Sequence, residues 1–246
     1  ILNQGTLIKS APVSTTIDTG VFVANTGTVR VLEGTLTIMS PSGALGDVDM
    51  SPGASLTLHG NYTINKPISL SGGGRLQLLG TWTNNSTISV DSGFLSLAGQ
   101  WANAGTLNVS NSTWFIDGTY TSLGTYTSFN NAFTYFGTFP GASLVADAST
   151  GDISLRGFTA NGTALRASGG ARFVAAATVN LNGCSLEGTL SVEQCSTLNI
   201  SAGLTFVNGG TVRIRNGTCT RTAVQFAGSV AQALSGLFRR QVALGF

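Results

Sequence analysis

The feature that most constrains the fold is an internal repeat. The segment GTWTNNSTISVDSGFLSLA, from Gly80 to Ala98, is followed directly by GQWANAGTLNVSNSTWFID, from Gly99 to Asp117. Related segments begin every 19 or 20 residues, at Gly20, Ser40, Gly60, Gly80, Gly99, Gly118, Gly137, Gly157 and Ala177, and the pattern resumes at Gly203. With residues 1–19 as a degenerate first copy, the chain holds about eleven units. A fixed period of this kind indicates a repeat architecture, in which each unit stacks on its neighbour.

Within each unit, apolar and polar residues alternate over two short stretches. Leu36 and Ile38 form one apolar pair, and Leu56 and Leu58 form the matching pair of the next unit. Alternation with a period of two indicates a strand buried on one face, and the Gly, Asn and Ser between stretches are typical of turns. We therefore expect an all-β fold, a single-stranded parallel β-helix of about eleven turns, in which Leu56 stacks on Leu36 and Leu76 on Leu56.

An Asn residue recurs at the fourth or fifth position of most units. Asn is a common turn residue, but turn preference alone does not account for the repeated offset. Side-chain amides at one inward turn can hydrogen-bond to their copies in the turns above and below. We expect such a structural ladder from Asn25, Asn65, Asn85, Asn103, Asn161, Asn182 and Asn208.

The run FVANTGTVRVLEGTLTI, residues 22–38, resembles the repeats of right-handed parallel β-helices in bacterial surface adhesins, autotransporter passengers and other giant secreted proteins. The resemblance covers most of the chain, from about Gly20 to Ile214. It is specific for the fold and weak for any one family. It implies a right-handed β-solenoid, an extracellular or cell-surface location, and a role in a surface structure or appendage.

Composition excludes several classes of partner. Charged residues make up 9% of the chain and the net charge is +2, with no basic stripe that would follow a phosphate backbone, so no nucleic acid is expected. No apolar run approaches the roughly 20 residues of a membrane span. The chain opens on Ile1 within the pattern and lacks an initiator Met, so we expect a mature product or a piece of a longer chain.

The last segment departs from the repeat. We divide the chain into a β-helix over residues 1–222 and a C-terminal segment over residues 223–246. In the latter, Val230, Leu234, Leu237 and Phe238 have helical spacing, which predicts a short amphipathic helix. It would cap the open last turn, or else dock onto a neighbouring domain or a membrane surface.

The sequence contains no arrangement typical of an active site. Asp47 and Asp49 form the one close acidic pair, and both are expected to point outward from a strand. The single histidine, His59, has no Ser or Asp placed to form a triad. We therefore expect no enzyme, no metal site and no cofactor.

The outward positions of the second strand of each unit form a flat, neutral strip that is a candidate interaction face. Such a strip fits lateral packing into a fibre, contact with sugars, or the ordering of water in ice binding. Ice binding would favour regular Thr-x-Thr motifs on one face, and the motifs that begin at Thr35, Thr81, Thr119 and Thr125 do not share a predicted face. The strip consists of Thr37, Thr57, Gln77, Ser96, Phe115, Thr134 and Ser154.

Two kinds of covalent modification are also open. The Asn-x-Ser/Thr motifs give glycosylation candidates at Asn61, Asn108, Asn111, Asn199 and Asn216, whereas Asn85 and Asn161 should be buried in the ladder and unmodified. The three cysteines are Cys184, Cys195 and Cys219, with no Cys-x-x-Cys spacing. They form either one disulfide and a free thiol or three small buried side chains.

These observations favour a secreted structural or adhesive β-solenoid: a rigid, rod-like subunit of an appendage, fibre, sheath or adhesin stalk. The expected partners are either further copies of the chain in a fibre or the neighbouring domains of a longer chain, and glycans are a further candidate. Membrane contact is expected only through the C-terminal segment. A β-helix that binds or cleaves carbohydrate is the alternative, and an ice-binding solenoid is a minor one.

Overall fold

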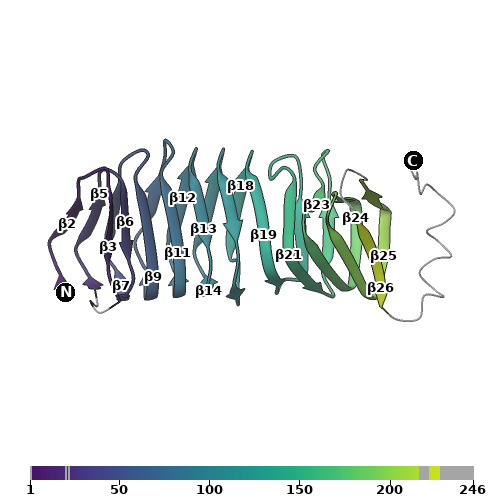
Figure 1. Ribbon diagram of the computed structural model, residues 1–246, viewed down its shortest axis with the longest axis horizontal. Coiled ribbons are helices and arrows are strands. Elements are labelled where there is room, and N and C mark those ends of the chain that lie inside the picture. Colours follow the sequence, from purple (N-terminus) through teal and green to yellow (C-terminus); the bar gives the residue numbers. More distant parts are fainter. Residues whose placement is uncertain (1, 20, 22, 216–221, 228–246) are drawn as a thin grey trace. The chain divides into compact units, whose positions relative to one another are not determined.

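The computed structural model describes residues 2–19, 21, 23–215 and 222–227, and every regular element in these ranges is a β-strand (Figure 1). The chain divides into two compact units, Ile1–Phe133 (unit 1) and Thr134–Phe246 (unit 2). Each unit winds the chain into successive turns whose strands pair in parallel.

Each turn of unit 1 contributes strand segments to three faces. Face 1 consists of β2 (Thr6–Lys9), β5 (Thr28–Val31), β8 (Asp47–Met50), β10 (Ile68–Leu70), β12 (Thr87–Asp91), β15 (Thr106–Ser110) and β18 (Thr125–Phe129). Face 2 consists of β3 (Ser14–Ile17), β6 (Thr35–Ile38), the first halves of β9 (Ser55–Ile64) and β11 (Arg75–Asn84), β13 (Phe94–Leu97) and β16 (Thr113–Ile116). Face 3 consists of β1 (Leu2–Asn3), β4 (Val23–Asn25), β7 (Pro41–Leu45), the second halves of β9 and β11, β14 (Gln100–Asn103) and β17 (Thr119–Tyr120).

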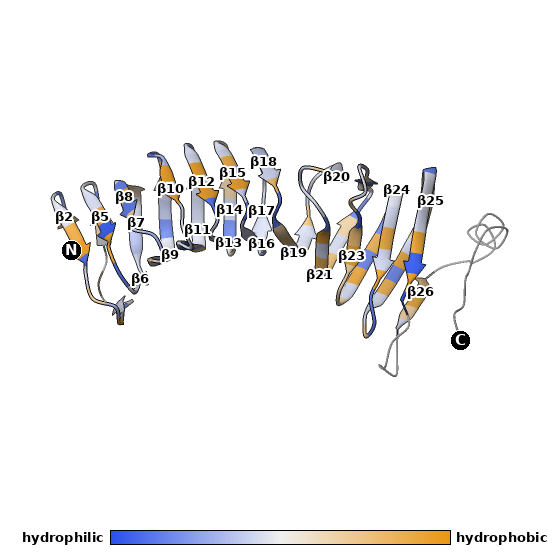
Figure 2. Ribbon diagram, turned by 90° about the horizontal axis from the view of Figure 1, so that it is seen from above, coloured by the Kyte–Doolittle hydropathy of each residue, from blue (hydrophilic) through white to orange (hydrophobic). Residues whose placement is uncertain are grey.

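Unit 2 is also wound into turns that pair in parallel, and some of its strands are longer. β19 (Ala132–Phe139) contains the division between the units. The strands that follow are β20 (Ser143–Ala146), β21 (Ile153–Asn161), β22 (Ala164–Ala167), β23 (Phe173–Ala175), β24 (Thr178–Val192), β25 (Thr197–Ile214) and β26 (Ala223–Ala227). β24 pairs with β25 over a whole turn, with register shifts between Asn182 and Cys184 and between Glu187 and Thr189. Figure 2 shows hydrophilic and hydrophobic bands alternating along both strands, as expected where one side of a strand is buried.

The core of unit 1 is built from columns of identical or similar residues, as the repeat predicts. On face 2, Leu36 pairs with Leu56, Leu56 with Leu76, and Leu76 with Leu95. All of these side chains are at most 2% exposed, and Trp114 continues the column without any exposure. The predicted stacking of one turn on the next is therefore confirmed.

The interior of face 3 carries a stack of aromatic rings. Tyr62, Trp82, Trp101 and Tyr120 occupy successive turns, and the two indole rings lie 5.1 Å apart with an interplanar angle of 1°. Each indole N–H donates to a backbone carbonyl, from Trp82 to Ala98 at 3.0 Å and from Trp101 to Asp117 at 2.9 Å. The two indole rings thus bury large apolar surfaces while their N–H groups stay paired.

Glycines fix the corner between faces 2 and 3. Gly99 has φ = +91°, which favours glycine, and a Cβ there would lie 2.1 Å from the carbonyl oxygen of Gly80 in the preceding turn. Gly80 stands in the same relation to Gly60, and Gly118 to Gly99. This close approach of backbones explains why glycine opens the units that begin at Gly80, Gly99 and Gly118.

The structure corrects two details of the predicted fold. The solenoid has about ten turns, whereas about eleven were predicted. The predicted helical cap is not supported, because Ala223–Ala227 forms β26 and pairs in parallel with Thr197–Ser201 of β25. β-structure therefore extends past the predicted boundary at residue 222, and residues 228–246, including the predicted helical positions Val230 to Phe238, lie outside the described residues. None of the described residues belongs to a helix of the length and hydrophobicity that a bilayer span requires.

Candidate interaction face

Most of the predicted interaction strip lies in one column on the outer side of face 2. Thr37 pairs with Thr57, Thr57 with Gln77, Gln77 with Ser96, and Ser96 with Phe115. The five side chains are half-exposed, and the Thr57 hydroxyl donates a 3.0 Å hydrogen bond to Oε1 of Gln77. The two other predicted members, Thr134 and Ser154, are half-exposed residues of unit 2, on β19 and β21.

A second outward column runs beside the first and was not part of the predicted strip. Its members precede those of the first column by two residues, so they point to the same side of the strand. The signal was available, because the same alternation that predicts one outward position in each turn also predicts its neighbour. The second column consists of Ser14, Thr35, Ser55, Arg75, Phe94 and Thr113.

The two columns together bring Ser/Thr-x-Thr motifs into register in three successive turns of face 2. Serine replaces the first threonine in two of these turns, so a search for Thr-x-Thr alone does not reveal the alignment. The aligned motifs are Ser14-x-Thr16, Thr35-x-Thr37 and Ser55-x-Thr57.

The later turns of face 2 carry a cluster of larger side chains. The guanidinium carbon of Arg75 lies 3.9 Å from the centre of the Phe94 ring. The Phe94 and Phe115 rings are 5.4 Å apart and tilted by 53°. A cation over an aromatic face and a tilted aromatic pair are both favourable arrangements, so these three side chains form a defined cluster.

Four charged side chains elsewhere in unit 1 form ion pairs between one turn and the next. Nε of Arg30 lies 2.8 Å from Asp49, and Nζ of Lys66 lies 3.8 Å from Asp47. All four side chains are more than half exposed, so each pair adds at most about 1 kcal/mol of stability. Asp47 and Asp49 point outward as predicted and face these cations.

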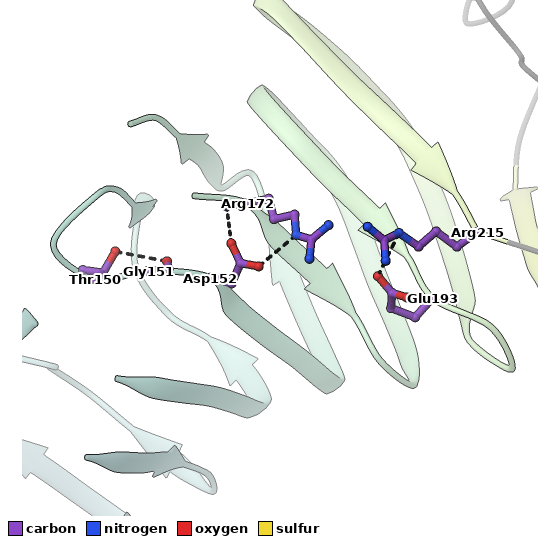
Figure 3. Close-up of polar contacts among 6 residues, drawn as sticks. All are labelled: Thr150, Gly151, Asp152, Arg172, Glu193 and Arg215. Carbon is purple, nitrogen blue, oxygen red and sulfur yellow. Dashed lines mark hydrogen bonds and ion pairs between the residues drawn. The ribbon is translucent and has the colours of Figure 1, made fainter. Parts of the chain in front are cut away.

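Unit 2 shows the same use of ion pairs between turns (Figure 3). Arg172 binds Asp152 twice, through its backbone N–H at 3.0 Å and its Nε at 2.8 Å. One turn further on, Nε of Arg215 lies 3.6 Å from Glu193. These contacts connect neighbouring turns, and the two acids are therefore already paired.

The predicted Asn ladder is divided into separate pieces. Asn25 accepts a hydrogen bond from Asn3, and Nδ2 of Asn84 donates to Oδ1 of Asn103 at 2.7 Å, so both pairs stack amides between turns. Asn25, Asn84 and Asn103 are at most 3% exposed. Asn84 was not among the predicted ladder residues.

The remaining predicted ladder residues are exposed. Asn85 donates to Asn65 at 3.0 Å, and Asn182 donates to Asn161 at 3.2 Å, on the outer surface. Asn208 donates to Glu187 at 2.9 Å, beside a shallow hollow lined by residues of β22, β24 and β25. The expected burial of Asn85 and Asn161 is wrong, because a shift of one residue along a strand moves a side chain to the opposite face.

The glycosylation candidates differ in whether the side-chain Nδ2 group, to which a glycan would be attached, is already hydrogen-bonded. Asn61 is exposed on face 3, with its motif partner Thr63 on the same side of β9. Nδ2 of Asn111 instead donates to Asp91 at 2.9 Å, and Nδ2 of Asn199 donates to Asn180 at 2.8 Å. Asn108, on face 1, accepts a hydrogen bond from Thr127, and Asn216 lies outside the described residues. Asn61 is therefore the best-placed acceptor among the described residues.

The hydrogen bonds around Asp91 affect its ionisation. Asn111 and Ser110 both donate to its carboxylate, which lowers the pKa of Asp91 below its ordinary value. Asp147 in unit 2 is held in a similar way, because hydrogen bonds from Ser149 and Thr150 lower its pKa. Asp91 thus links one turn of the solenoid to the next, whereas Asp147 accepts donors from its own loop.

The cysteines and the histidine do not form a reactive group in the described residues. Cys184 is a free, buried thiol, and Cys195 is disulfide-bonded. Cys219 lies outside the described residues. His59 is exposed at the corner between faces 2 and 3, and the described residues contain no cluster of three His, Cys, Asp or Glu residues that would hold a metal ion.

The protein can be classified by its fold alone. No family model matches the chain, and neither a curated protein nor a solved structure shows significant similarity to it. The pairing of the strands defines the class: the protein is a parallel β-solenoid of about ten turns.

Proposed function

We propose that this protein is a secreted structural or adhesive β-solenoid that acts at a cell surface and is not an enzyme. The observation that carries the proposal is the outer side of face 2, where two in-register columns give six turns a largely neutral, polar surface. A surface of this kind suits repeated contact with a partner along the solenoid. Stacked cores and paired interior amides supply stability turn by turn, as a load-bearing or ligand-presenting element requires.

The location can be tested in the source cells with antibodies raised against the purified protein. We expect label on the cell surface or on an appendage in immunogold electron microscopy, and protein in the surface or medium fraction. Label confined to the cell interior would overturn the proposal. Electron microscopy of the purified native material then tests self-association, with ordered filaments as the expected result and separate monomers at all concentrations as the contrary one.

Ice binding is a second candidate, favoured by one observation. The Ser/Thr-x-Thr motifs at Ser14, Thr35 and Ser55 are aligned in three successive turns, which gives a regular array of hydroxyl groups. If this array orders water, the protein inhibits ice recrystallisation, and the substitution Thr37→Lys at its centre abolishes the inhibition. Equal crystal growth with the protein and with a control protein would exclude this function.

A further inference from the structure

We propose that the cluster of Arg75, Gln77, Phe94, Ser96 and Phe115 on face 2 is a binding site for an acidic glycan, a saccharide chain that carries carboxylate groups. The inference rests on the proposed adhesive function and specifies its ligand. It is carried by the charge, the aromatic surface and the spacing of this cluster.

Arg75 supplies an uncompensated positive charge. Among the described residues of unit 1, Arg30 and Lys66 face carboxylates, and the ammonium group of Lys9 donates to the backbone carbonyls of Ala11 and Glu33. Arg75 has no carboxylate within ion-pair distance in that part of the chain. It is also the one charged side chain in the two outward columns of face 2.

The position of the guanidinium group suits a carboxylate ligand. It lies over the Phe94 ring at 3.9 Å, which fixes the side chain against the face. A guanidinium fork held in this way is preorganised for two parallel hydrogen bonds to a carboxylate, a geometry that lysine does not offer. The other members of the cluster, Gln77, Phe94, Ser96 and Phe115, are themselves uncharged and do not repel an anionic ligand.

The aromatic rings supply an apolar surface for the sugar ring. Phe94 and Phe115 are half-exposed on a strand face that is otherwise polar, with their centres 5.4 Å apart. A half-exposed phenylalanine ring presents an apolar surface to solvent. The C–H face of a pyranose ring can pack on that surface and cover it. A sugar packed on Phe115 would lie one turn from Ser96 and two turns from Gln77, in the same column.

The spacing of the polar groups suits a linear chain. Adjacent parallel strands are about 4.8 Å apart, which is comparable with the length of one sugar residue. Gln77 accepts a hydrogen bond from Thr57 through Oε1, which orients the amide. A saccharide running across the turns therefore meets a hydroxyl or amide group at each step, from Ser96 to Thr57.

The test is calorimetric titration of the purified protein with an oligogalacturonate, compared with a galactose oligomer of the same length. We expect binding of the acidic oligomer and at least about tenfold weaker binding by Arg75→Gln, since a charge-assisted bidentate contact is lost. Arg75→Lys retains the charge without the fork and should lose part of the affinity. Phe115→Ser should weaken binding several-fold.

Arg30→Gln is the matched control, because it removes the same charge from face 1, outside the proposed site. It should leave binding unchanged. Equal losses in Arg30→Gln and Arg75→Gln would show only diffuse attraction and overturn the site. Failure of the wild-type protein to bind the acidic oligomer, or equal binding of the neutral one, would overturn the inference as well. Either result would leave a surface location intact, whereas glycan binding by an intracellular protein would overturn the proposed function and leave the site intact.

Discussion

The side-chain amide of Asn84 donates a 2.7 Å hydrogen bond to that of Asn103 in the next turn, and neither side chain has any exposed surface. The other groups are satisfied as well. Asn84 also donates to the carbonyl of Ser86 and accepts from its backbone N–H, and Asn103 donates to the carbonyl of Leu123. A buried amide pair with its partners in place specifies how one turn sits on another.

Replacing Asn84 therefore tests the ladder. Asn84→Ala should lower the free energy of unfolding by about 2–3 kcal/mol, because the backbone N–H of Ser86 and the side-chain Oδ1 of Asn103 both lose their hydrogen bond to Asn84. Urea denaturation followed by circular dichroism measures the change. Asn85→Ala is the control, because Asn85 is exposed and binds only Asn65 in the outer layer, and it should cost no more than about 0.5 kcal/mol. Equal losses would contradict the assignment of the buried column.

The glycine corner gives a second test, with Gly99→Ala compared with Gly73→Ala. Both glycines have positive φ, +91° and +84°, but only Gly99 has a backbone oxygen where the Cβ would be placed. Gly73→Ala should cost about 1–2 kcal/mol for the conformation alone. Gly99→Ala should cost about 3 kcal/mol or more, because neighbouring turns must also move apart. Thermal unfolding of the two variants distinguishes these costs, and equal effects would contradict the close approach.

The buried phenols predict sensitivity to alkaline pH. Burial raises the pKa of Tyr62 and of Tyr120 above the ordinary value of 10.0. The pKa of each phenol is higher in the folded chain than in the unfolded chain. The contribution of the buried, neutral phenols to the free energy of unfolding is therefore fully present below about pH 10 and is lost as the pH rises further. We expect the tyrosinate absorbance of these residues to appear together with unfolding. Tyr120→Phe should reduce the alkaline loss, and ionisation of both phenols in a folded chain would contradict their burial.

The two described cysteines should differ in reactivity. Cys184 is a buried thiol, so an alkylating reagent should modify it only after denaturation, without a reductant. Cys195 should become reactive only after reduction, because it is disulfide-bonded. Peptide mass mapping of the native protein, of the denatured protein and of the denatured and reduced protein checks both expectations. Modification of Cys195 in the unreduced, denatured protein would contradict the disulfide.

The fold was predictable from the sequence because period and alternation are properties of the chain itself. The Leu36, Leu56 and Leu76 column follows directly from them. The Asn ladder was harder, because Asn84 and Asn85 are adjacent and neighbouring residues of a strand point to opposite faces. The inward column is Ile64, Asn84 and Asn103, each four residues after its unit start, whereas the prediction took Asn85, five residues after Gly80.

The candidate site was predictable only in part. The column from Thr37 to Phe115 was found by counting outward positions, but the neighbouring column with Arg75 and Phe94 was not. The contact between Arg75 and Phe94 joins residues 19 positions apart in the sequence, and only the stacking of turns brings them together. The helical spacing near the C-terminus shows the limit of pattern alone, since Ala223–Ala227 pairs as a strand with β25.

The equivalence of Gly80 and Gly99 has an evolutionary consequence. Thr81 pairs with Gln100 and the following residues pair in step, so loss of the segment from Gly80 to Ala98 would join Leu79 to a residue equivalent to its present neighbour. Duplication of the same segment would insert a complete turn in the same register. Unequal recombination can therefore lengthen or shorten such a gene by whole turns, which makes the length of the protein a heritable trait that selection can adjust separately from its stability.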